Sequence, residues 1–120
     1  MVSSVLVVDD DPAFLALAAQ VLDGLGVEVV LTAQDAAAAI SEADAKRPEA
    51  AIVDVGLPDR DGIDLARQLA ELPWGPRVAV TSTDRDAGLA VDARQGDGAL
   101  AFIPKEDLAS ATLRELLTGE

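Results

Sequence analysis

The sequence contains no cysteine and no histidine, and these two absences exclude several classes of site. Without cysteine there is no disulfide and no thiolate zinc site. Without histidine the chain lacks the commonest general base, the usual ligand of transition metals and any residue that carries a phosphohistidine. A metal site in this chain would therefore use oxygen ligands, which favour a hard cation such as Mg²⁺.

Basic residues are also scarce, since 9 Lys and Arg stand against 22 Asp and Glu, for a net charge of −13. Nucleic acids and anionic membranes need Lys and Arg to neutralise their phosphates, so we expect neither as a direct partner. No apolar run approaches the ~20 residues of a membrane span, and no signal peptide is evident at the start. These features predict a soluble cytoplasmic protein whose acidic surface suits a cation or a basic partner.

Aromatic residues make up only 2% of the chain, although half of its residues are hydrophobic. The core must therefore come from Val, Leu, Ile and Ala, which is typical of closely packed helices on a sheet. A length of 120 residues fits one domain, so we predict a single domain over residues 1–120.

Short apolar runs of strand length alternate with segments of helical periodicity. The predicted strands cover residues 5–8, 27–31, 50–53, 78–80 and 100–103. The predicted helices cover residues 12–25, 35–45, 63–70, 84–95 and the segment from 108 to the C-terminus, with Asp11 and Asp35 as expected N-caps. The strands are apolar at consecutive positions, as in parallel sheets covered on both faces. We predict an α/β fold, a doubly wound (βα)₅ with helices on both faces of a five-stranded parallel sheet.

Ligands bind such folds at the carboxyl ends of the strands, and four of the predicted strands end in polar residues. They are Asp9, Asp10 and Asp11 after the first, Asp54 after the third, Thr81, Ser82 and Thr83 after the fourth, and Lys105 after the fifth. Clustered carboxylates repel one another unless a cation intervenes, and a carboxylate beside Mg²⁺ can attack phosphorus. The metal, the lysine and a hydroxyl could then share the three phosphoryl oxygens. Each residue alone has a plainer interpretation as a helix cap or a solvated charge. Unrelated caps and charges, however, would have no reason to fall at the ends of four strands with complementary chemistry, so the group as a whole favours a site.

The same residues resemble the receiver domains of bacterial response regulators over essentially the whole chain. The matching segments are residues 5–11 (VLVVDDD), 52–62 (IVDVGLPDRDG), 80–82 (VTS) and 102–105 (FIPK). The resemblance implies a flavodoxin-like sheet of strand order 2-1-3-4-5, with Asp54 as the phosphoacceptor. It implies Mg²⁺ held by Asp9, Asp10, Asp54 and the backbone carbonyl of Gly56. It also implies Thr81 as a switch hydroxyl, Lys105 as its partner at the phosphoryl group, and Phe102 either as a switch aromatic or as an ordinary core residue.

The family's function would make this chain a signalling phosphoacceptor and not an enzyme in its own right. By resemblance, a sensor histidine kinase or phosphotransfer protein supplies the phosphoryl group. The switch would then act on the surface of the fourth helix, the fifth strand and the fifth helix. Its output would be a downstream protein, an attached domain if the chain is part of a longer regulator, or a phosphorylation-dependent homodimer.

Four details of the sequence give further expectations. Most relatives place a proline joined by a cis bond after the lysine, whereas here Glu106 follows, so we expect a trans bond. Gly56 presents no side chain to the phosphoryl pocket, so the phosphoryl lifetime is expected to differ from that of relatives with a polar group. Gly62 is expected to adopt a positive φ and to start the third helix. Trp74 is expected at the opposite edge of the sheet, as a packing or surface residue and not as part of the site.

Two rival functions would use the same residues, and a third would use the same fold. A hydrolase of the haloacid-dehalogenase type also combines an aspartate nucleophile, Mg²⁺ and a lysine, but it needs a second aspartate where this chain has Gly56. A pseudo-receiver would bind partners without phosphorylation. What argues against it is the presence together of all the expected site residues, which are Asp9, Asp10, Asp54, Thr81 and Lys105. Flavin or dinucleotide binding would need a glycine-rich loop after the first strand.

Overall fold

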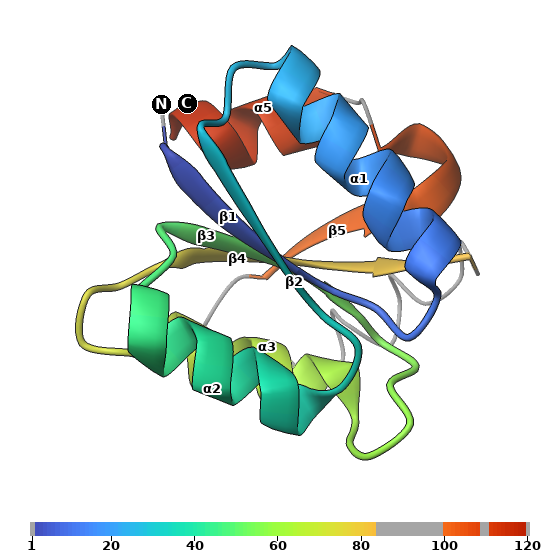
Figure 1. Ribbon diagram of the computed structural model, residues 1–120, viewed down its shortest axis with the longest axis vertical. Helices are drawn as coiled ribbons and strands as arrows, with labels where there is room; N and C mark the ends of the chain where they lie inside the picture. The colour runs from blue at the N-terminus through green and yellow to red at the C-terminus, as the bar shows by residue number, and fades with distance from the viewer. Residues whose placement is uncertain (1, 84–99, 109–110, 120) are drawn as a thin grey trace.

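A computed structural model of the protein describes residues 2–83, 100–108 and 111–119. Its centre is one parallel sheet with the strand order β2-β1-β3-β4-β5, which confirms the predicted order (Figure 1). The strands are β1 (Ser4–Val8), β2 (Val29–Ala33), β3 (Ala50–Asp54), β4 (Arg77–Ser82) and β5 (Ala101–Pro104). The order places β1 and β3 side by side at the centre, so the residues that follow them meet at one edge.

Helices cover both faces of this sheet, as the sequence predicts. They are α1 (Pro12–Gly24), α2 (Ala36–Lys46), α3 (Gly62–Ala70) and α5 (Ala111–Thr118), and a short 3₁₀ helix, η1 (Lys105–Asp107), follows β5. In Figure 1, α1 and α5 lie on one face and α2 and α3 on the other. The helix expected over residues 84–95 lies outside the described residues. No helix in the described ranges has both the length and the apolar character needed to cross a bilayer.

Alternate residues of each central strand supply two separate cores. Leu6 and Val8 of β1 belong to the core under α2 and α3. Val5 and Val7 belong to the core under α1 and α5. All four side chains are fully buried, which accounts for the run of consecutive apolar residues in this strand.

Aspartates begin three of the helices by accepting hydrogen bonds from exposed backbone N–H groups. Asp11 accepts from the N–H of Ala13 (2.9 Å) at the start of α1, and Asp35 accepts from the N–H of Ala38 (2.7 Å) at the start of α2. The sequence predicted both caps. Asp61 caps α3 in the same way through Ile63, which sequence reasoning missed.

Several predicted boundaries were wrong by one to three residues, and β2 and β4 extend two residues beyond their predicted ends at residues 31 and 80. Two of the differences have a clear physical reason. The second strand begins at Val29 instead of Val27, because the N–H of Val27 donates to Leu22 O (3.0 Å) in the turn that ends α1. The fifth helix begins at Ala111 instead of Leu108. Leu108 is buried in the core beneath α1 and α5 just after η1, so its apolar character reflects packing at the end of a 3₁₀ turn.

Trp74 lies at the edge of the sheet where the strands begin. Its indole N–H donates to Pro48 O (2.9 Å), and the guanidinium of Arg47 lies 5.4 Å from the ring centroid. Pro48 immediately precedes β3, so this packing contact is at the end of the strand opposite Asp54, as predicted.

Candidate functional site

Three carboxylates converge where β1 and β3 end. Asp9 and Asp10 follow β1, Asp54 is the last residue of β3, and each offers an oxygen within 4.8 Å of the others. Asp9 and Asp54 are buried, whereas Asp10 is exposed. The structure therefore brings together the three acidic residues that the sequence places at these strand ends.

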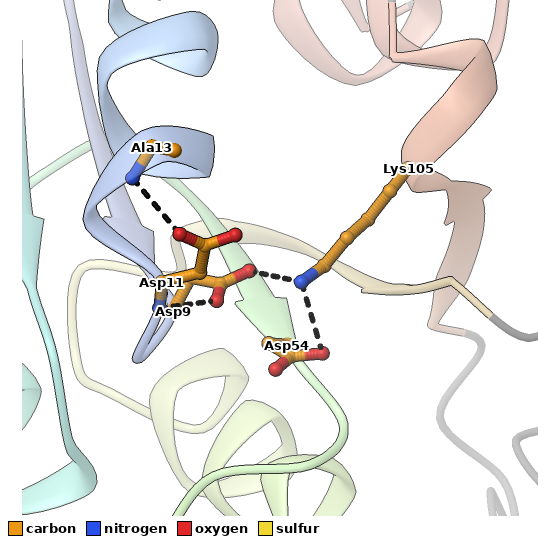
Figure 2. A network of polar contacts seen from close by, with 5 residues as sticks. All are labelled: Asp9, Asp11, Ala13, Asp54 and Lys105. Carbon is orange, nitrogen blue, oxygen red and sulfur yellow. Dashed lines mark hydrogen bonds and ion pairs between the residues drawn. The ribbon is translucent and has the colours of Figure 1, made fainter.

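The two oxygens of Asp9 have different partners (Figure 2). Oδ1 accepts a hydrogen bond from the N–H of Asp11 (2.9 Å), which fixes the carboxylate at the turn into α1. Oδ2 forms an ion pair with the ammonium of Lys105 at 2.5 Å, and no hydrogen bond to this oxygen is found among the described residues.

Lys105 reaches the carboxylates from the far side of the site (Figure 2). Its Nζ lies 3.8 Å from Asp54 Oδ1 as well as beside Asp9, and its side chain is only 14% exposed. The residue opens η1 directly after β5, and no cis peptide bond occurs among the described residues. The bond between Lys105 and Glu106 is therefore trans, as expected.

Burial raises the pKa of Asp54, and the negative charge of Asp9 raises it further. Lys105 and a backbone hydrogen bond from Gly56 act in the opposite direction without reversing the shift. The single ammonium of Lys105 therefore does not offset the burial and the negative charge of this group of carboxylates. Additional positive charge would stabilise it, and oxygen ligands without sulfur or nitrogen suit a hard divalent cation such as Mg²⁺.

Two glycines of the loop after β3 lie close to Asp54, for different reasons. A Cβ at Gly56 would lie 3.9 Å from Asp54 Oδ2, so a side chain at this position would face the carboxylate at ordinary contact distance. A Cβ at Gly62 would lie 1.9 Å from the backbone oxygen of Asp54, which no side chain tolerates. Gly62 does begin α3, but its φ is not positive. The expected reason for this glycine was therefore wrong, because close backbone approach is what excludes a side chain.

Thr81 lies next to Asp54 in the sheet, since the two residues are paired in the register of β3 and β4. Its side chain is fully buried, and Oγ1 has no hydrogen-bond partner within the described part of the chain. A buried hydroxyl without a partner is unfavourable by about 1–3 kcal/mol and is uncommon in folded proteins.

Phe102 lies on β5, where it pairs with Val80. It is partly buried and packs against the core under α2 and α3. This position is compatible with either of the interpretations that the sequence left open.

Sequence reasoning missed two contacts that shape the site. Asp59 accepts hydrogen bonds from the N–H groups of Ala36 (2.9 Å) and Ala37 (3.2 Å), which ties the loop after β3 to the start of α2. The ring of Phe14 has its centroid 4.7 Å from Lys105 Nζ. Helical periodicity identified Phe14 only as an apolar residue, and no local signal reveals contacts between residues 23 or 91 positions apart in sequence.

Comparisons with known proteins concern the family and the fold of this chain. A sequence model of the family described as "Response regulator receiver domain" matches residues 5–118. The chain is 33% identical over 129 aligned positions to the transcriptional regulatory protein PdtaR of Mycobacterium tuberculosis, covering 97% of this chain and 62% of that protein. It is 34% identical over 119 positions to a protein-glutamate methylesterase/protein-glutamine glutaminase of Xanthomonas campestris, covering 94% of this chain and 32% of that protein. The chain thus spans less than two thirds of either relative.

Solved structures show the same fold. A CheY-like response regulator receiver domain protein from Methanospirillum hungatei superposes with a TM-score of 0.74 at 25% identity, covering 97% of this chain and 94% of that one. The chemotaxis protein CheY4 of Vibrio cholerae superposes with a TM-score of 0.75 at 23% identity, covering 98% of this chain and all of that one.

Proposed function

The chain belongs to the response regulator receiver domain family, and from that premise we propose that it accepts a phosphoryl group on Asp54 from a phosphohistidine. The observation that carries the proposal is the group of three converging carboxylates with Lys105 beside two of them. The donor would be a sensor histidine kinase or a phosphotransfer protein. In this proposal residues 1–120 form one receiver unit.

In the proposed reaction a carboxylate oxygen of Asp54 forms a bond to phosphorus while the phosphorus–nitrogen bond of the donor breaks. The imidazole leaves with its electron pair, and the phosphoryl group remains as an aspartyl phosphate. Asp9, Asp10, Asp54 and the backbone carbonyl of Gly56 would hold Mg²⁺. When bound, Mg²⁺ neutralises charge on the carboxylates and on the transferred group. Lys105 would move from Asp9 to a phosphoryl oxygen, because its ammonium already lies between Asp9 and Asp54.

The phosphoryl group would add a charge of about −1.5 to −2 and three strong acceptor oxygens beside Thr81. The buried hydroxyl of Thr81 has no hydrogen-bond partner among the described residues, and it would gain a hydrogen bond by donating to one of these oxygens. A shift of Thr81 would leave space for Phe102 to change its packing. The switched surface would then include β5, α5 and the helix expected over residues 84–95.

The proposed role is that of a signalling phosphoacceptor, with uptake and release of the phosphoryl group as its only chemistry. The relatives include a transcriptional regulator and a methylesterase, each longer than this chain. We therefore propose that the output lies in a downstream protein, in an attached domain or in a phosphorylation-dependent homodimer.

Phosphoryl uptake from acetyl phosphate, followed by intact mass with and without Mg²⁺, tests the proposal. The wild-type chain should gain one phosphoryl group only when Mg²⁺ is present, and Asp54→Ala should gain none. Asp11→Asn is the matched control, because Asp11 belongs to the same acidic run but caps α1 through Ala13. Labelling of Asp54→Ala would contradict the assignment. Absence of any uptake by the wild type, even from phosphorylated kinases, would favour a pseudo-receiver, and turnover of a simple phosphate ester would favour a hydrolase.

A further inference from the structure

The ammonium of Lys105 lies over an aromatic ring as well as beside two carboxylates. Its Nζ is 4.7 Å from the ring centroid of Phe14, a distance at which a cation is attracted to the face of the ring. We propose that Phe14 is a positioning residue for phosphoryl transfer, which holds the Lys105 ammonium at the carboxylates by this cation–π contact. The role of Phe14 in the reaction rests on the proposed function of Asp54.

Phe14 is fixed by the same turn that fixes Asp9. Asp11 donates its backbone N–H to Asp9 and caps α1 through Ala13, so the first turn of this helix is anchored to the site. The ring itself packs into the core under α1 and α5 and is only 7% exposed. Phe14 therefore presents a rigid surface to Lys105.

The side chain of Lys105 has no such anchor of its own. The residue lies between Pro104 and Glu106 at the start of η1, and its ammonium reaches the carboxylates at the end of a long stem. The lysine carries its charge on a flexible four-carbon stem, and ordering such a side chain is entropically unfavourable. A fixed attractive surface on one side of the ammonium reduces the number of positions that it occupies.

The type of contact also suits a lysine that must change partners. The face of a phenyl ring attracts a cation but offers no lone pair that would fix the direction of an N–H group. The ammonium can therefore remain against Phe14 while its N–H groups turn from Asp9 (2.5 Å) toward a phosphoryl group on Asp54, whose Oδ1 is 3.8 Å away. A leucine at position 14 would fill similar space without this attraction.

Phe14 also fills space in the core under α1 and α5, and two aliphatic variants separate this packing role from the cation–π role. Phe14→Leu and Phe14→Met each keep an apolar side chain, and Phe14→Tyr keeps the ring. At saturating Mg²⁺, uptake from acetyl phosphate should be about three- to tenfold slower in both aliphatic variants, the range that corresponds to a cation–π contact. Phe14→Tyr should stay close to the wild-type rate. Leu17→Ala is the matched control on the same helix, because Leu17 is 49% exposed, and it should also keep the wild-type rate.

The effect must depend on the lysine if Phe14 acts through it. In a Lys105→Ala background, Phe14→Leu should therefore cause no further loss of rate. A second measurement needs no phosphoryl donor: in NMR spectra of the unmodified protein, the side-chain protons of Lys105 next to Nζ should be shifted upfield by the ring, and this shift should vanish in Phe14→Leu.

Any of three results would overturn the proposal. The first is a wild-type uptake rate in both aliphatic variants, and the second is an equally large loss of rate from Phe14→Leu in the Lys105→Ala background. The third is an NMR shift of the Lys105 protons that stays unchanged in Phe14→Leu. If the wild type takes up no phosphoryl group, the proposed function of Asp54 fails instead. The NMR comparison then still decides whether Phe14 positions Lys105.

Discussion

At the scale of single residues, Asp54 is held where its own negative charge is unfavourable. Burial and Asp9 raise its pKa in the folded protein, so between the unfolded and folded pKa values the folded state binds more protons than the unfolded state. Stability must therefore fall as the pH rises through this interval. The carboxylate needed for the proposed chemistry is thus retained at the expense of the stability of the metal-free protein.

Asp54→Asn should accordingly stabilise the protein in a buffer with a metal chelator. The gain should be near zero at a pH below the ordinary pKa of aspartate, and it should reach about 1 kcal/mol at neutral pH, a typical size for one substitution. Urea denaturation of both proteins across this pH range measures the difference. A variant that is less stable than the wild type at neutral pH would contradict the unfavourable charge inferred for Asp54.

Gly62 is a second residue whose identity is fixed by Asp54, this time through the backbone. Gly62→Ala places a Cβ 1.9 Å from Asp54 O, so the start of α3 and the end of β3 must separate. We expect a loss of about 2–3 kcal/mol in the free energy of unfolding, as for overpacked cores. Gly24→Ala is the control, because Gly24 has no atom within 4 Å of a built Cβ and no positive φ. That change should raise stability by about 0.5 kcal/mol, and equal effects of the two substitutions in denaturation curves would be inconsistent with the close approach.

At the scale of elements, the loop after β3 is attached to two helices by its own aspartates. Asp61 caps α3 through Ile63, and Asp59 accepts from Ala36 and Ala37 at the start of α2. The loop carries Gly56, whose carbonyl is a proposed metal ligand, so these two caps define where that carbonyl lies.

Asp59→Ala should loosen this loop from α2. Amide hydrogen exchange at Ala36 and Ala37 should accelerate, and the affinity for Mg²⁺ should fall severalfold. The hydrogen bond from Ala36 lowers the pKa of Asp59. The stabilisation is therefore present above the ordinary pKa of aspartate and is lost as the pH falls through the lowered value, so the variant and the wild type should converge in acid. Asp44→Ala, on the exposed face of α2, should leave exchange at Ala36 and Ala37 unchanged, and slow exchange in Asp59→Ala would refute the tether.

The individual strands and helices show how far the fold could be predicted from the sequence. Consecutive apolar residues predicted β1 and β3 correctly, because a central parallel strand is buried on both faces along its length. The prediction of β2 shifted by two residues, because Val27 is buried in a turn and the edge strand itself is partly exposed. The sequence could predict that Asp9, Asp10 and Asp54 converge, because the strand order brings the carboxyl ends of β1 and β3 together. The contacts of Phe14 and Asp59 depend on how α1 and α2 pack, and no local pattern records that.

At the scale of the whole molecule, a net charge of −13 on 120 residues implies general self-repulsion in addition to the local repulsion at the carboxylates. Simple salt screens the general repulsion, whereas a bound cation relieves the local one. The two effects can therefore be separated by experiment.

Mg²⁺ should stabilise the protein beyond the effect of NaCl at matched ionic strength. A ligand at one hundred times its Kd adds about 2.7 kcal/mol to the free energy of unfolding when it binds only the native state. Thermal melts in the two salts measure this excess, and Asp10→Asn should remove most of it while keeping the response to NaCl. Equal shifts in both salts, or a full Mg²⁺ effect in Asp10→Asn, would count against a site at Asp9, Asp10 and Asp54.

The backbone N–H of Val2 donates to Leu117 O at 2.8 Å, so the start of β1 and the end of α5 lie next to each other (Figure 1). A linker of a few residues can therefore close this chain into a ring, and the ring can be reopened at a surface turn such as that of Gly75, where a built Cβ meets no atom. Both the closure and the new opening are at the sheet edge remote from Asp54. A circular permutant of this kind would carry a fused reporter on that remote edge while Asp54 stays open to its donor.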